Sequence, residues 1–235
     1  MYNFKNRNVM KKVIIMLSAL ATVSCSVQNK TTNKPLMIPL KVGRENQPVQ
    51  FETLRIEPIY LIVQDRSPKI ELRLEATESN SSKKFSTTLP YSYSGHNIHD
   101  PIAFENYIFS LKINNDNVHL VVEKLDFGKV FFIEFEQKAL IGNFSISFED
   151  SASAWYEDPF ENYLESREYF KILVSDYNEQ KELCFGALYA RGREKKLFEY
   201  GSNKDSRDKL LFEWKGYRIF VLDAGGRLLK LKIDN

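Results

Sequence analysis

Apolar side chains recur at every second position through most of the chain after residue 50. Ile70, Leu72 and Leu74, for example, alternate with Glu71, Arg73 and Glu75. A period of two is typical of a strand with one buried and one solvated face, whereas the helical period of 3.6 is rare here. The pattern predicts an all-β, mainly antiparallel fold, most simply a two-layer β-sandwich.

Polar turn residues divide these alternating segments into hairpins. Residues 107–113 and 118–122 flank an Asn-Asn-Asp-Asn turn, and Asn and Asp tolerate left-handed backbone. Segments 130–136 and 143–149 are expected to pair around Gly142. Near the C-terminus, segments 210–215, 217–222 and 228–233 predict a three-stranded meander with turns at Lys215-Gly216 and residues 224–227. Its middle strand is apolar on both faces, which predicts an inner strand that is covered on both sides.

Three further segments depart from simple alternation. The continuous apolar run Ile59–Val63 predicts a strand that is covered on both sides. Asp158-Pro159 offers an N-cap followed by proline at the first helical position, which predicts a short helix to about Glu168. Asp100-Pro101 predicts a second short helix, ending by Asn106 at the latest.

The two Asp-Pro sites also resemble each other in sequence. Each is followed by Phe-Glu-Asn-Tyr, at Phe104–Tyr107 and at Phe160–Tyr163. A duplicated half-domain with a boundary near residue 150 would explain the repeat, and coincidence is the alternative.

The N-terminal 25 residues have the pattern of an export signal. Lys5, Arg7, Lys11 and Lys12 precede an apolar run, Val13–Val23, that is short for a membrane span. The run ends in Ala21-Thr-Val-Ser-Cys25, which resembles the lipobox of bacterial lipoproteins. The resemblance implies a signal peptide at 1–24, cleavage before Cys25 and lipidation of Cys25, and hence a bacterial cell-envelope protein that is lipid-anchored to a membrane on its periplasmic or surface-facing side.

The remaining chain is expected to be a tethered domain. Residues 25–50, with the lipidated cysteine, a polar stretch and three prolines, predict a flexible tether, and residues 51–235 predict the β domain. Without the four basic leader residues the chain has 29 basic and 31 acidic side chains, a net charge of −2. This balance gives no basic field for nucleic acid.

Few residues have the spacing of a catalytic or metal site. Neither a nucleophile elbow, a phosphate loop nor a zinc-protease motif is present, so no catalytic residue, metal site or cofactor is predicted. His96, His99 and Asp100 are potential donors, but their segment is expected to be a polar loop. The oxygen-rich segment 176–182 lacks the glycine and glutamate of a calcium loop and predicts a hairpin turn. Cys184 lies between apolar neighbours and is expected to be buried.

Two pairs of aromatic residues are expected in loops, where they are available to a partner. These are Tyr91 with Tyr93 and Trp155 with Tyr156. Exposed Tyr and Trp suit a protein surface or a sugar ring because they are apolar with a polar tip, and packing at the edge of the core is the alternative. The favoured hypothesis is an immunity- or inhibitor-like envelope module that captures a protein partner. The alternatives are a glycan-binding or transport-complex accessory lipoprotein and, third, an envelope hydrolase.

Overall fold

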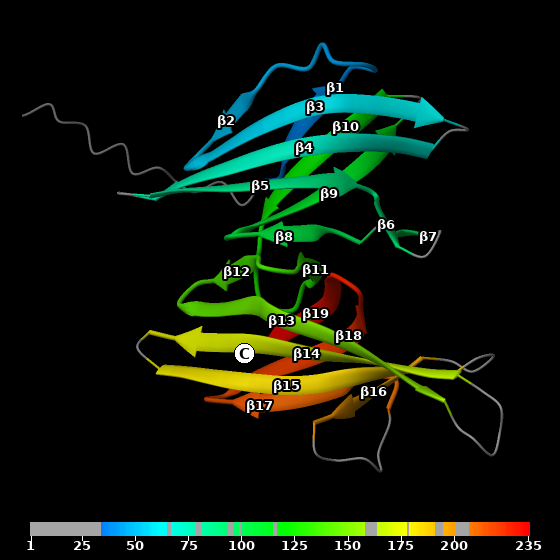
Figure 1. The fold of residues 1–235 in the computed structure, drawn as a ribbon. Helices are drawn as coiled ribbons and strands as arrows, with labels where there is room; N and C mark the ends of the chain where they lie inside the picture. The colour runs from blue at the N-terminus through cyan, green and yellow to red at the C-terminus, as the bar shows by residue number, and fades with distance from the viewer. Residues whose placement is uncertain are drawn as a thin grey trace, which may run out of the picture. The chain divides into compact units, whose positions relative to one another are not determined.

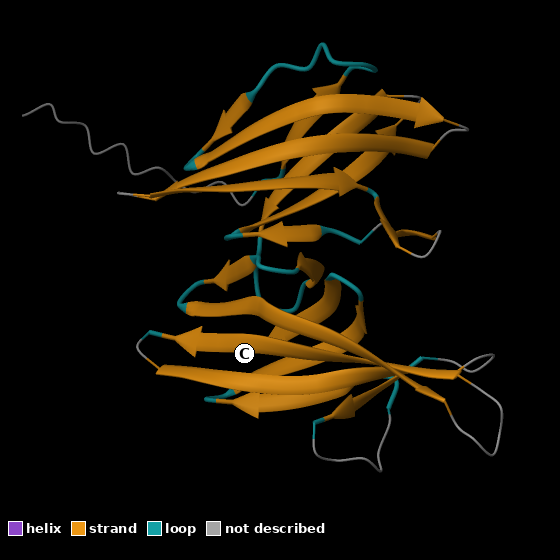
Figure 2. Ribbon diagram, in the orientation of Figure 1, coloured by secondary structure: helices purple, strands orange, loops and turns teal. Residues whose placement is uncertain are grey.

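The computed structural model describes residues 34–64, 67–78, 81–93, 96–98, 100–114, 117–157, 164–177, 179–190, 195–200 and 207–235. These residues form strands, turns and irregular segments without a helix (Figure 2). The expected all-β, mainly antiparallel, sandwich-like fold is therefore confirmed. Within this described part there is accordingly no helix with the length and apolar character needed to cross a membrane.

Most strands belong to three sheets (Figure 1). The eight-stranded sheet has the order β1 (Leu36–Leu40), β10 (Asn117–Lys124), β9 (Tyr107–Asn114), β8 (Ile102–Phe104), β11 (Val130–Glu134), β19 (Leu228–Asp234), β18 (Tyr217–Gly225) and β17 (Leu210–Trp214). The five-stranded sheet contains β12 (Lys138–Ile141), β13 (Phe144–Glu157), β14 (Leu164–Asp176), β15 (Glu179–Ala190) and β16 (Lys196–Glu199). The four-stranded sheet contains β2 (Val49–Phe51), β3 (Leu54–Gln64), β4 (Ser67–Glu78) and β5 (Ser81–Leu89). A two-stranded ribbon of β6 (Tyr91–Tyr93) and β7 (His96–Ile98) completes the set.

The eight-stranded sheet contributes to two hydrophobic cores, one on each face. Ile102 and Phe104 of β8 belong to the core shared with the four-stranded sheet, whereas Ala103 belongs to the core shared with the five-stranded sheet. On β11, Phe132 lies in the first core and its neighbours Phe131 and Ile133 lie in the second. The central strands are therefore buried on both faces, as their unbroken apolar sequences require.

The C-terminal meander forms as the sequence predicts. β18 lies between β17 and β19, and Ile219 and Val221 are fully buried in the second core. The turn at Lys215-Gly216 has positive φ at both residues, 52° and 88°, which is the geometry of a tight hairpin connection. The β9–β10 hairpin is also confirmed, with Asn114 opposite Asn117.

One predicted pairing is wrong. β13 pairs with β12, around Gly142, whereas β11 pairs with β19 and, in parallel, with β8. Glu136, between β11 and β12, has a φ of 64°, and this left-handed turn separates the two strands. β11 instead lies in the centre of the eight-stranded sheet, where both of its apolar faces are covered.

Both predicted helices are corrected where the structure describes them. Ile102–Phe104 form β8, and residues 164–168 belong to β14, while residues 158–163 lie outside the described part. The amide of Phe132 donates to the Pro101 carbonyl at 2.8 Å, so the Asp100-Pro101 segment joins the sheet. Burial of three consecutive apolar residues outweighs the local helix-start signal.

The segment expected to be tether contains two strands. β1 pairs with β10 in register from Leu36↔Val122 to Leu40↔Val118, and β2 pairs with β3. Pro39 is accommodated because β1 is an edge strand, where a missing backbone donor can face away from the sheet. Ordered structure is therefore already present at Leu36, before the expected start near Phe51, and residues 34–235 form one compact unit.

The apolar run in β3 is covered on one side, not on both. Leu61 is buried, but Tyr60, Ile62 and Val63 are 38%, 41% and 43% exposed. A β-bulge between Pro58 and Tyr60 shifts the register, and the four-stranded sheet packs through one face alone.

Candidate functional site

The aromatic residues expected in loops lie on strands. Tyr91 and Tyr93 belong to β6, opposite Ile98 and His96, and Trp155 and Tyr156 belong to β13, opposite Ser166 and Glu165. Their side chains are outside the described part, as is Cys25. A partner surface at these four residues and lipidation of Cys25 therefore stay predictions.

The histidine-rich segment is not brought together as a metal site in the described residues. His96 lies on β7, and His99 is outside the described part. The carboxylate of Asp100 accepts a hydrogen bond from Lys230 Nζ at 2.8 Å, which ties it to β19. Among the residues that the structure describes, no group of three His, Cys, Asp or Glu side chains is placed to hold a metal ion.

An aromatic cluster lies on the five-stranded sheet, on the face turned away from the core. Tyr169 of β14, Phe198 of β16 and the adjacent Tyr200 form it, and we call these three residues the aromatic face. The Tyr169 ring contacts the rings of Phe198 and Tyr200 edge-on, with centroids 5.9 and 6.0 Å apart. Tyr200 is 69% exposed, and its amide donates to the Cys184 carbonyl at 3.2 Å.

A glycine positions the aromatic face. Gly186 of β15 lies opposite Tyr169 on one side and Phe198 on the other. The Phe198 ring lies directly over Gly186, so that a Cβ added there would be 2.3 Å from Phe198 Cζ. A glycine inside a strand is typical of such a close approach.

A hollow of about 190 Å³ adjoins the aromatic face. The side chains around it that point away from the core belong to Asp150, Ala152, Tyr169, Lys171, Cys184 and Tyr200. Cys184 is exposed, so its predicted burial is wrong. Period two explains the error, because Leu183 and Phe185 take the core positions of β15 and Cys184 points the other way.

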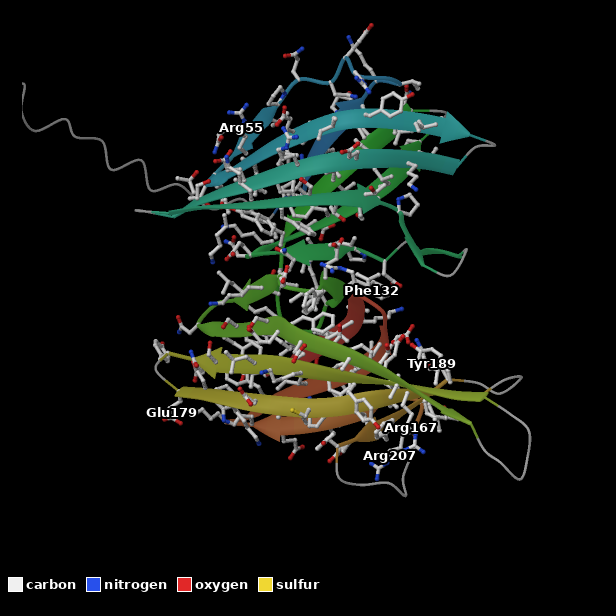
Figure 3. The ribbon with its side chains drawn as sticks, viewed as in Figure 1. Arg55, Phe132, Arg167, Glu179, Tyr189 and Arg207 are labelled. Atoms are coloured by element: carbon white, nitrogen blue, oxygen red, sulfur yellow. The ribbon has the colours of Figure 1, made fainter. Side chains whose placement is uncertain are left out.

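A second cavity, of about 240 Å³, lies on the opposite side of the β13–β14 pair. We call it the end pocket, and it is lined by Ser151, Ala152, Ser153, Glu168, Phe170, Gly226 and Arg227. Glu168 Oε2 accepts a hydrogen bond from the Gly226 amide at 2.8 Å. The Tyr189 hydroxyl lies 3.2 Å from the same oxygen and 2.9 Å from the Ala224 carbonyl, so its one proton is shared between these two acceptors. Figure 3 shows Tyr189 at this end of the sheet, where β14 begins and β15 ends.

Lys195 and Arg227 bring positive charge to the same end of the sheet. Lys195 Nζ donates to the Ala224 carbonyl at 2.9 Å and forms an ion pair with Asp223. The guanidinium of Arg227 lies 4.8 Å from the centre of the Phe135 ring. It also acts electrostatically on Glu134, whose pKa is raised by burial even though Arg227 and a 2.6 Å hydrogen bond from Thr87 Oγ1 act to lower it.

Sequence reasoning missed the aromatic face and the end pocket. Gly186, directly after the apolar segment around Cys184, was the available signal for a close approach. Nothing local indicated that Phe198 and Tyr200 lie beside Tyr169, because β14, β15 and β16 are brought together by pairing. The end pocket combines β13 and β14 with a turn more than 50 residues away.

Comparison of the chain with models of protein families, with curated proteins and with solved structures gave no match. The functional argument therefore rests on the chemistry of these two sites.

Proposed function

We propose that this protein is a lipid-anchored cell-envelope binding module that captures a protein partner on the aromatic face. The aromatic face itself is the observation that carries the proposal. Tyrosine and other aromatic residues are enriched at the energetic centres of interfaces, because a rigid ring buries a large area at little entropic cost. Tyr200 leaves most of its ring in solvent, next to a hollow that can receive a partner's side chain.

Charges around the hollow add directional contacts. Lys171 lies opposite Asp150 and 3.9 Å from Glu182, so both signs of charge surround the apolar centre. An apolar centre with a polar surround is the usual anatomy of a protein interface. Tyr169 and Phe198 stand on paired strands, which hold them more rigidly than a loop would, and Tyr200 follows β16 directly.

Membrane attachment is proposed from the lipobox resemblance at Cys25. Lipid attachment would keep the module at a membrane, because each buried methylene contributes about 0.8 kcal/mol. Ten residues separate Cys25 from the start of β1 at Leu36, so the domain would work close to the membrane. An envelope protein is therefore the partner that we propose.

The first test is site-specific photo-crosslinking in the native host. A photoreactive phenylalanine analogue replaces Tyr200, or, as the matched control, Tyr177, which is 76% exposed in the β14–β15 turn. We expect one crosslinked protein from position 200 that position 177 does not give. Equal products at both positions, or no product at 200, would contradict the proposal.

The second test measures binding of the identified partner after purification. Tyr200→Asn should weaken binding at least about ten-fold, as expected for an interface centre. Tyr177→Asn is the control, since asparagine tolerates the positive φ of that residue, and it should leave affinity unchanged. Competition by soluble sugars in place of a protein would favour the glycan-binding alternative instead.

A further inference from the structure

The end pocket contains polar groups that other described residues leave unpaired. Among the described residues, none makes a hydrogen bond with the hydroxyl of Ser151 or Ser153. Within the same part of the chain, the Arg227 guanidinium forms no ion pair at salt-bridge distance, although it faces the Phe135 ring and interacts electrostatically with Glu134. A guanidinium has five donors and a hydroxyl both donates and accepts, so the pocket offers several directional contacts to a ligand.

Glu168 supplies the fixed acceptor of the pocket. The Gly226 amide donates to Oε2 at 2.8 Å, which sets the orientation of the carboxylate. This donor holds Oε2, so Oε1 can accept from a ligand. Ionised carboxylates form the stronger class of hydrogen bond with hydroxyl donors.

The charge of the pocket restricts the chemical class of the ligand. One carboxylate and one guanidinium line it, so a phosphate or another strongly anionic group would meet Glu168, and a cation would meet Arg227. A neutral ligand with several hydroxyls satisfies both residues at once. Phe170 adds apolar surface suited to the C–H face of a ring.

The volume of the end pocket restricts the class of ligand further. Pockets for drug-sized ligands are about 300–1,000 Å³, so a cavity of about 240 Å³ suits a single ring. We propose that the end pocket binds one neutral sugar ring through Glu168, Arg227 and the two serine hydroxyls. This site lies on the other side of the β13–β14 pair from the aromatic face and stands independently of the function proposed there.

The test uses saturation-transfer NMR on the full-length protein in a detergent without a sugar headgroup. The probes are glucose, galactose, mannose, N-acetylglucosamine and N-acetylgalactosamine, with glucuronic acid and inorganic phosphate as anionic comparisons. We expect transfer to the ring protons of at least one neutral sugar. Its dissociation constant should be on the order of 1 mM, as for a ligand of about a dozen non-hydrogen atoms.

Protein variants locate the binding site, and a comparison of a monosaccharide with its trisaccharide shows whether the ligand is a free sugar or a glycan chain. Glu168→Gln and the double variant Ser151→Ala/Ser153→Ala should each weaken binding about ten-fold, whereas Ser86→Ala, on the exposed face of β5, should not change it. Equal affinity for a monosaccharide and its trisaccharide indicates a free sugar, and tighter binding of the trisaccharide indicates a glycan chain.

Ser153→Phe provides a second line of evidence, because a ring at this exposed position fills the pocket with little effect on the core. We expect it to abolish sugar transfer while the melting temperature stays within a few degrees of wild type. Absence of transfer from every neutral probe would overturn the proposal. Transfer that persists in both Glu168→Gln and Ser153→Phe would overturn it equally.

Discussion

Gly186→Ala is predicted to destabilise the protein through one contact. The added Cβ would lie 2.3 Å from Phe198 Cζ and 2.8 Å from both Cε atoms, distances that real Cβ atoms do not reach. Phe198 has little room to move, because it is 8% exposed and its ring meets Tyr169 edge-on. The strand or the ring must therefore shift.

Two effects of opposite sign determine how much Gly186→Ala changes the free energy of unfolding. Replacing glycine by alanine reduces the entropy of the unfolded chain and by itself stabilises a protein by about 0.4–1 kcal/mol. Overpacking a tight contact costs about 1–3 kcal/mol. The overpacking dominates at mid-range, so we expect a net loss of about 1.3 kcal/mol in the free energy of unfolding, within limits of about 0–2.6 kcal/mol. For a chain of this size, the mid-range loss should lower the melting temperature by about 3–5 °C.

A double-mutant cycle assigns the cost to Phe198. Phe198→Leu removes the ring atoms that the new Cβ would meet, so Gly186→Ala in that background should be neutral or stabilising. The free energies of unfolding come from urea denaturation of the four proteins. A loss of the same size in both backgrounds would refute the steric explanation, and so would a stabilising effect of Gly186→Ala in the wild-type protein.

Three other predictions concern titration, core and location. Because the folded-state pKa of Glu134 lies above its ordinary 4.5, its contribution to stability is present at low pH and is lost as the pH rises through the folded pKa. In thermal melts, the melting temperature of Glu134→Gln should therefore rise relative to that of wild type between pH 4 and 7, and that of the exposed control Glu182→Gln should not. A difference between Glu134→Gln and wild type that stays constant with pH would contradict this. A chain ending at Val221 should fail to fold in circular dichroism, because it loses β19, whose Leu229, Leu231 and Ile233 are fully buried and contribute roughly 1.5–3 kcal/mol each. A chain starting at Leu36 keeps every strand of the described residues and should melt like the full chain. An unchanged transition after the C-terminal truncation would show the meander to be dispensable. Cys25→Ser should move the protein from the membrane pellet to the soluble envelope fraction, and lipid labelling that persists in this variant would disprove attachment at Cys25.

Strands and hairpin turns were predictable because they depend on neighbouring residues. Alternation with period two identified the meander, and the Lys215-Gly216 turn followed from its residue types. The expectation that β18 is covered on both faces is wrong, however: Ile219 and Val221 are buried, whereas Phe220 and Leu222 on the opposite face are partly exposed.

The tertiary structure decided which strand each strand pairs with and which of its two faces is buried. β11 pairs with β19, almost a hundred residues later, because the centre of the eight-stranded sheet covers both faces of β11. The same long-range burial turns the Asp100-Pro101 segment into part of a sheet and leaves Cys184 in solvent. Alternation assigns residues to two faces but does not state which face will be buried. The aromatic face and the end pocket depend on that choice, and each joins residues from strands that meet only in the folded chain.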